Sequence, residues 1–216
     1  MTFWIAQFLG LAVAYLLGSI PAGYLTARML KGVDLRTLGS GGTGATNVLR
    51  TLGAGPFWAV LAFDVAKGAC AILVIKALEA RLAFPATLNA SVFIPWATSL
   101  GGIVAILAHA RPVWLRFQGG KSVAVGLGVL LALSWPVALG GLAAFGALLA
   151  VTRIMSVGSM AAAVAAIGVS LALPHPLPVR LMVIAGGLYV IVRHRANLGR
   201  IAAGTEPRIG QRVNLT

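Results

Sequence analysis

The stretch PFWAVLAFDVAKGACAILVIKAL, residues 56–78, decides which kind of fold this chain can adopt. A helix needs about 20 mostly apolar residues to cross the hydrocarbon core of a bilayer, and this run is long enough. Asp64 and Lys67 lie near its middle, three positions apart, so they can pair on one face of a helix. Ionisable groups inside a span mark either a function or a structural pair. We favour a structural pair in which Lys67 orients nearby glycine-rich loops.

Composition extends this interpretation to the whole chain of 216 residues, which is 59% hydrophobic and 10% charged, with a mean hydropathy of +0.96. Such values are typical of an integral membrane protein. The net charge of +13 raises the question of nucleic acid binding. The basic residues, however, cluster between apolar runs, which predicts membrane orientation, with anionic lipids or substrates as partners and no nucleic acid. The single cysteine, Cys70, cannot form an intramolecular disulfide.

Seven apolar runs qualify as spans, and they predict an all-α integral membrane protein with seven transmembrane helices in one domain, 1–216. The first run lacks a preceding basic segment and is too long for a signal peptide, so it is expected to be retained. Residues 122–152 could form one tilted helix, but Pro136 favours two short spans. The runs are 3–27, 56–78, 92–110, 122–135, 137–152, 158–173 and 179–193.

The basic residues predict the orientation of these spans. One set of connections holds Arg28, Lys31, Arg36, Arg50, Arg111, Arg116, Lys121, Arg153, Arg193, Arg195, Arg200, Arg208 and Arg212. The alternate set holds Lys76, Arg81 and Arg180. Because positive loops stay in the cytoplasm, the amino terminus is expected outside and the carboxyl terminus inside.

Four polar segments then share the cytoplasmic side: 39–50, 116–122 (RFQGGKS), 156–159 (SVGS) and 193–207. Their convergence predicts a site at the membrane surface. No internal repeat is visible, which weakens an inverted-repeat transporter as an alternative.

The first polar segment, GSGGTGATNVLR at 39–50, combines flexible backbone with hydrogen-bond donors. Successive glycine amides can form a concave nest that suits an anion, and Ser40, Thr43, Thr46 and Asn47 add side-chain donors. The segment is expected to run into a helix, so that Arg50 faces the same spot one turn later. The alternative is a flexible linker.

The second segment resembles the end of a P-loop, but Leu115 stands where the full motif requires glycine, so no nucleotide site follows. Gly119 and Gly120 let the backbone approach a phosphate, and Lys121 supplies a charge. The alternative for Lys121 is a membrane anchor.

The tail motif HRANLGR places His194, Asn197 and Arg200 three residues apart on one helical face that could hold a polar head. Arg193 and Arg195 are expected to be membrane-surface anchors. Arg208 and Arg212 are expected to be solvated.

Acidic residues are scarce: Asp34, Asp64, Glu79 and Glu206. They form no carboxylate pair for acid/base work and no metal set, so no metal or cofactor is expected. No histidine heads an HxxxxD pattern, and His109 is expected to be a hydrogen-bonded residue at a helix end. A site without a protein carboxylate base needs an activated substrate with a good leaving group.

Taken together, the motifs closely resemble the PlsY family, the acyl-phosphate-dependent glycerol-3-phosphate acyltransferases of bacteria. The resemblance rests on LLGSIPAGYL (16–25), GSGGTGATNVLRTLG (39–53), DVAKG (64–68), AHARPVWLRFQGGKSVAVGLG (108–128), the Ser-x-x-Ser of SVGS, and RHRANLGRIAAGTEPRIG (193–210). The resemblance implies seven spans in the bacterial inner membrane, an amino terminus outside and an active site facing the cytoplasm.

The implied reaction moves a fatty acyl group from acyl-phosphate to the sn-1 hydroxyl of glycerol 3-phosphate. It also implies an acyl-phosphate-producing enzyme as a partner. The implied catalytic residues are Lys121, His194 and Asn197, and the substrate-binding ones are Ser40, Gly41, Thr46, Asn47, Arg50, Gly119, Gly120, Ser156 and Ser159.

Four positions depart from the family pattern: Gly42, Ser122, Ala196 and Arg111. They are expected to change affinity or donor preference before activity. A carrier of an organic phosphate remains the main alternative, and a passive membrane scaffold is a third.

Overall fold

The computed structural model describes residues 2–211, and over that range it consists of helices and their connections, which confirms the expected all-helical class. Arg212 lies outside the described residues. The α-helices are α1 (Thr2–Ser19), α2 (Ala22–Lys31), α3 (Ala45–Leu52), α4 (Ala54–Glu79), α5 (Ala90–Ala110), α6 (Val123–Leu133), α7 (Trp135–Thr152), α8 (Met155–Ala172), α9 (Leu177–Arg193) and α10 (Arg195–Ala202); the short 3-10 helices are η1 (Leu35–Thr37) and η2 (Val113–Leu115).

Five helical segments of the described chain are long and apolar enough to cross a membrane: α1 together with α2, α4, α5, α7 and α8. The pair α9 and α10, bent by 50°, makes a sixth candidate. Helix α6 is apolar but short, since at about 1.5 Å per residue it covers only about 16 Å of a core that is about 30 Å thick. The predicted count of seven spans therefore stays a prediction.

One predicted span is interrupted, and one predicted loop is wrong. The run 3–27 contains a break, because α1 ends at Ser19 and α2 begins at Ala22, although the two helices together still form one candidate span. Pro21 lies between them, and it lacks the N–H that a continuous helix requires. The segment 156–159 was expected to be a loop, but it forms the first turns of α8.

The break expected within residues 122–152 is confirmed. It falls at Ser134, whose extended backbone separates α6 from α7. Pro136 then sits in the first turn of α7, where a helix needs no intrahelical donor. The two halves of this segment can therefore turn back on each other.

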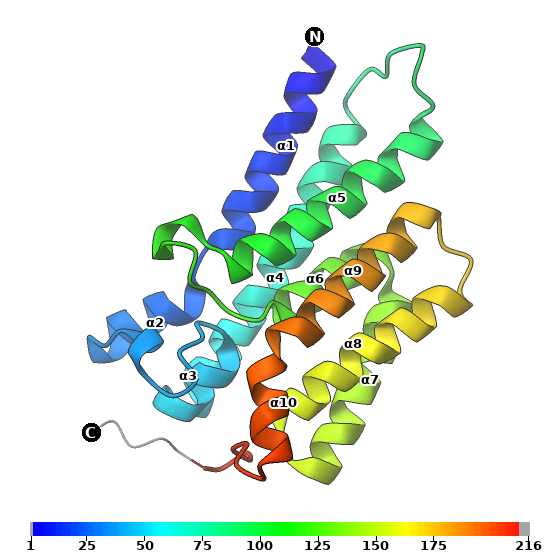
Figure 1. Cartoon of the computed structure of the whole chain (residues 1–216). Coiled ribbons are helices and arrows are strands. Elements are labelled where there is room, and N and C mark those ends of the chain that lie inside the picture. The colour runs from blue at the N-terminus through cyan, green and yellow to red at the C-terminus, as the bar shows by residue number, and fades with distance from the viewer. Residues whose placement is uncertain (1, 212–216) are drawn as a thin grey trace.

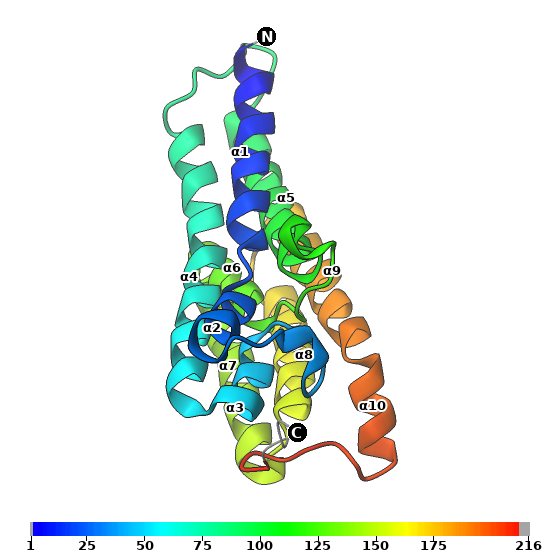
Figure 2. The same ribbon diagram turned by 90° about the vertical axis from the view of Figure 1, so that its left-hand side faces the viewer.

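The connections gather at two ends of the molecule (Figures 1 and 2). One end, which we call the loop-rich end, holds α2, α3, α10 and the connections 111–122 and 153–154. The amino terminus and the connection 80–89 lie at the opposite end. All four polar segments predicted to share one side of the membrane therefore do lie at one end of the helices.

Glycines set the closest helix contacts. A Cβ atom on Gly68 of α4 would lie 2.3 Å from the Val125 carbonyl oxygen of α6, and one on Gly128 of α6 would lie 1.9 Å from the Val65 carbonyl oxygen. Neither position has room for a side chain. Small residues at such crossings let two helix backbones approach within the membrane, where van der Waals packing replaces the hydrophobic effect. The α4–α6 contact holds the start of α6 beside the loop-rich end.

Replacing Gly128 with alanine should therefore destabilise the protein, because the new methyl group must displace the backbone of α4. We expect a loss of about 1–3 kcal/mol, typical of an overpacked interior, measured as a lower unfolding temperature in detergent. Gly126→Ala on the same helix is the matched control, since its Cβ would meet nothing within 4 Å. Equal unfolding temperatures for the two variants would contradict this packing.

Candidate active site

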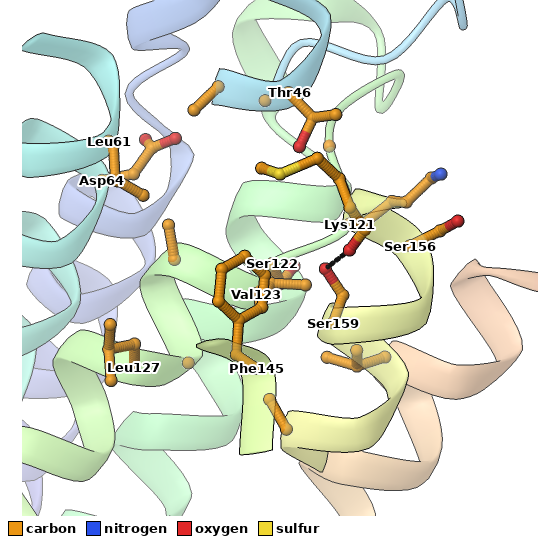
Figure 3. A pocket seen from close by; sticks show the side chains of 18 of the residues that line it. Thr46, Leu61, Asp64, Lys121, Ser122, Val123, Leu127, Phe145, Ser156 and Ser159 are labelled. Atoms are coloured by element: carbon orange, nitrogen blue, oxygen red, sulfur yellow. Dashed lines mark hydrogen bonds between the residues drawn. The ribbon is translucent and has the colours of Figure 1, made fainter. Parts of the chain in front are cut away.

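A cavity of about 560 Å³ lies among α3 to α9 at the loop-rich end. Figure 3 shows its two kinds of wall: Thr46, Lys121, Ser156 and Ser159 lie toward one part, and Leu127 and Phe145 lie in another. The apolar part is lined by side chains from α6, α7, α8 and α9. One cavity thus offers both a polar compartment and a compartment for an apolar chain.

Three helices begin at this cavity. Residues of their first turns line it: Ala45 and Thr46 in α3, Val123 and Ala124 in α6, and Met155 and Ser156 in α8. The first N–H groups of a helix have no intrahelical partner, and the helix dipole makes this end positive. Three such ends directed at one space favour an anion there.

Lys121 joins the second polar segment to the tail. Its ammonium group donates a hydrogen bond to the Asn197 side-chain oxygen, and the Asn197 amide donates to Glu206 Oε1 at 2.6 Å. The pKa of Lys121 is lowered to about 8, chiefly by burial; the charge of Glu206 opposes this shift, and the guanidinium groups of Arg200 and Arg50 contribute to it. The structure thus keeps a positive charge in a partly dry place, ready for an anionic ligand.

Glu206 is a cavity residue that the sequence did not indicate. It lies at the cavity and accepts hydrogen bonds from Ser156 at 2.9 Å and Arg200 at 2.6 Å, and Arg50 approaches its Oε1 at 3.5 Å. Burial acts to raise the Glu206 pKa, but hydrogen bonds from Asn197, Arg200 and Ser156 hold it below its usual value.

The sequence predicted a site without a carboxylate base, and Glu206 nevertheless reaches the cavity. Because the Glu206 oxygens are occupied by these donors, the carboxylate balances charge and is a poor proton acceptor. The feature of the sequence that could have indicated this role of Glu206 is that it is a single acidic residue in a strongly basic tail.

His194 stands at the junction of α9 and α10, buried and facing the cavity. Its Nδ1 lies 2.7 Å from the Val190 carbonyl oxygen, which can only accept, so Nδ1 carries the proton. In an uncharged ring, Nε2 then has a free lone pair. Of the three residues expected on one face, His194 and Asn197 line the cavity, and Asn197 and Arg200 both donate to Glu206.

Asn47 has a different role from the expected one. Its Oδ1 accepts from the Ser40 amide at 3.1 Å, while its Nδ2 donates to the carbonyls of Leu38 and Gly42, each at 2.9 Å. These bonds occupy the side chain within its own loop. Asn47 therefore shapes the segment that presents Ser40 and Thr46 to the cavity.

The three glycines expected to bind substrate differ in where they lie. Gly41 is exposed with φ +69° and lies outside the cavity wall. Gly119 also lies outside it, and a Cβ there would come within 2.2 Å of the His109 carbonyl oxygen. Gly120 does line the cavity, and its Cβ would come within 2.2 Å of His109 Nε2.

Two further residues of the site have clear local partners. Ser159 lines the cavity and donates to the Met155 carbonyl oxygen at 2.8 Å. Arg193 is not a free surface anchor as expected, because it donates to the Gly120 carbonyl oxygen at 2.9 Å and so fixes the second polar segment. Arg195 and Arg208 are exposed, in line with expectation.

The structure shows how two of the residues that depart from the family pattern, Ser122 and Ala196, are accommodated. Ser122 has φ +65°, a left-handed conformation that favours glycine, and its hydroxyl donates to the Ile106 carbonyl oxygen at 2.6 Å. That bond anchors Ser122 in this conformation. Ala196 is exposed on α10 and lies outside the cavity wall. In the part of the chain that the structure describes, no three His, Cys, Asp or Glu side chains gather as a metal site would require.

Comparison with known proteins agrees with this geometry. A family model described as "Glycerol-3-phosphate acyltransferase" matches residues 8–204. The glycerol-3-phosphate acyltransferase of Trichormus variabilis is 50% identical over 93% of this chain and 91% of its own length. Glycerol-3-phosphate acyltransferase 2 of Rhizobium johnstonii is 52% identical over 98% of this chain and 99% of its own length.

Two solved structures share the fold. Both are of PlsY (YgiH), described as an integral membrane glycerol 3-phosphate acyltransferase. The glycerol 3-phosphate form superposes with a TM-score of 0.84 at 35% identity, covering 94% of this chain and 96% of the other. The lysophosphatidic acid form gives 0.81 at 34% identity, covering 95% of this chain and 96% of the other. This chain belongs to the glycerol-3-phosphate acyltransferase family of which PlsY is a member.

Proposed function

We propose that this protein transfers a fatty acyl group from acyl-phosphate to the sn-1 hydroxyl of glycerol 3-phosphate. The main observation behind this proposal is that one cavity has both a cationic, amide-rich part and an apolar part. An acyl-phosphate has an anionic head and a lipid tail, and glycerol 3-phosphate brings a second anion. The relatives named glycerol-3-phosphate acyltransferase support the acceptor.

The proposed role of each residue follows from where its side chain or backbone lies relative to the cavity. Lys121, Ser40, Thr46 and the starts of α3 and α6 hold the donor phosphate, while the tail lies among α6 to α9. The Gly41, Gly119 and Gly120 backbones shape these segments. Glycerol 3-phosphate binds at a second set of groups, which come from the first segment, the start of α8 and the tail: Arg50, Ser156, Ser159, His194 and Asn197.

In the reaction, the sn-1 oxygen forms a bond to the acyl carbon, and the bond from that carbon to the phosphate oxygen breaks. Phosphate leaves with the electron pair. A substrate phosphate takes the hydroxyl proton, with His194 Nε2 as the competing base, because Glu206 is already saturated by donors. Positioning and fixed donors supply most of the acceleration.

We further propose seven spans, with the amino terminus outside and the site facing the cytoplasm of a bacterial inner membrane. The concentration of basic residues at the loop-rich end supports this orientation. The whole chain acts as one membrane domain, and an acyl-phosphate-producing enzyme supplies its donor.

The direct test gives purified protein hexadecanoyl phosphate and labelled glycerol 3-phosphate. We expect labelled 1-acylglycerol 3-phosphate and one phosphate released for each lipid formed. An organic-phosphate carrier would instead accumulate label inside vesicles without a lipid product, and that result would overturn the proposal.

Removing the Lys121 charge should nearly abolish turnover without unfolding the protein. Loss of one preorganised donor to a developing anion costs on the order of a hundredfold in rate, so Lys121→Ala should lower kcat by at least that factor. Lys31→Ala is the matched control, because Lys31 is exposed at the end of α2. Similar kcat values for both variants would count against the role of Lys121.

The lowered pKa of Lys121, about 8, predicts the pH dependence. The amine is charged below this pH and neutral above it, so kcat/KM should fall as pH rises through about 8, whereas an unperturbed lysine stays charged to about pH 10. Lys121→Arg should remove this alkaline limb, because the guanidinium stays protonated. Initial rates corrected for spontaneous donor hydrolysis measure the effect, and an unchanged limb in the arginine variant would refute the assignment.

A further inference from the structure

A buried polar triad beside the cavity has no role in the proposed reaction so far. Asp64 and Lys67 of α4 and His109 of α5 are all at least nine-tenths buried, and Asp64 and His109 line the cavity. The expected pair of Asp64 and Lys67 is confirmed, with Lys67 Nζ 2.7 Å from Asp64 Oδ1. His109 extends this pair toward the site.

Lys67 fixes which nitrogen of His109 carries the proton. The ammonium lies between three acceptors: Asp64 Oδ1, the Ile20 carbonyl oxygen at 2.6 Å and His109 Nδ1 at 3.0 Å. It pairs with Asp64 by charge and donates to the Ile20 carbonyl, and an ammonium group has no lone pair with which to accept from Nδ1. Asp64 is 3.7 Å from Nδ1, too far for a hydrogen bond. Nδ1 therefore accepts from Lys67, and the uncharged ring carries its proton on Nε2.

That Nε2–H is directed to the place where the two glycine-rich segments meet. A Cβ on Gly120 would lie 2.2 Å from Nε2, and one on Gly44 would lie 3.9 Å from it. Both glycines line the cavity next to Lys121. In the described residues 2–211, the hydrogen bond of the His109 ring is made by Nδ1, and Nε2 takes part in none. A donor without a protein partner, on a side chain that lines a substrate cavity, is suited to a substrate acceptor.

We propose that His109 is a catalytic hydrogen-bond donor whose Nε2–H binds an oxygen of the acyl-phosphate group, with Lys67 and Asp64 holding the ring in the required tautomer. The inference rests on the proposed acyl-phosphate reaction. No proton is transferred, since the ring stays uncharged and stabilises negative charge that grows on the donor as phosphate departs. Gly120 is required because any side chain there would meet the ring.

The test compares His109→Phe with His109→Gln in the full-length protein. Phenylalanine keeps a ring but removes the donor, whereas glutamine supplies an amide N–H at a similar reach. With hexadecanoyl phosphate as donor, we expect His109→Phe to lose about a hundredfold in kcat, with the KM for glycerol 3-phosphate within a few fold of the unsubstituted protein. His109→Gln should recover at least tenfold of that loss.

The other outcomes of this experiment would contradict the catalytic role of His109 or the proposed function, and they can be told apart. A kcat near that of the unsubstituted protein in His109→Phe, or equal losses in the two variants, overturns the role of His109. Matched loss of unfolding temperature and activity in both variants would show a structural role alone and also overturns it. His175→Phe controls for the substitution, because His175 binds Ser134 at the opposite end. Failure of the unsubstituted protein to form lipid would reject the proposed function instead.

Discussion

The site depends on holding concentrated positive charge at a place with little water. Lys121, Arg50 and Arg200 meet there together with three helix N-termini, and such a group repels itself unless an anion is present. Glu206 provides that anion from the tail, and its hydrogen bonds reach Ser156 of α8 and Asn197 of α10. The carboxylate therefore keeps the cationic groups in place while leaving the cavity able to receive phosphate.

The same arrangement ties the four polar segments into one unit. Lys121 reaches the tail through Asn197, Arg193 reaches the second segment through Gly120, and Glu206 approaches Arg50 of the first. Glycine contacts between α4 and α6 bring the start of α6 to the same level. The packing of α4 against α6 thus sets the position of the cavity residues at the start of α6. A substitution at Gly128 or Gly68 should therefore also change the geometry of the cavity.

Much of the fold was predictable because apolar runs, and the proline and glycine residues that interrupt them, are local features of the sequence. The turn between α6 and α7 followed from Pro136, and the starts of α3 and α6 followed from glycines before helix-forming residues. The break at Pro21 was missed because apolar residues continue on both sides of it. Segment 156–159 was misassigned because its two serines suggested a loop, although serine is common in the first turn of a helix.

The site was less predictable where contacts are long-range. Glu206 acts through residues 6 to 156 positions away in the chain, and no local pattern reports such contacts. Asn47 was correctly placed at the cavity, but its bonds to the surrounding carbonyls became visible only with the folded loop. His109 showed the same limit, because its tautomer depends on Lys67 from another helix.

The central claim is that the polar segments meet on one side of the membrane to hold two phosphorylated molecules. Single cysteines at Ser40 and Arg116, in protein whose Cys70 is replaced, test it by labelling with an impermeant thiol reagent in oriented vesicles. The account predicts that both positions react from the cytoplasmic side alone and that glycerol 3-phosphate with acyl-phosphate slows the labelling at Ser40. Labelling of the two positions from opposite sides would contradict it.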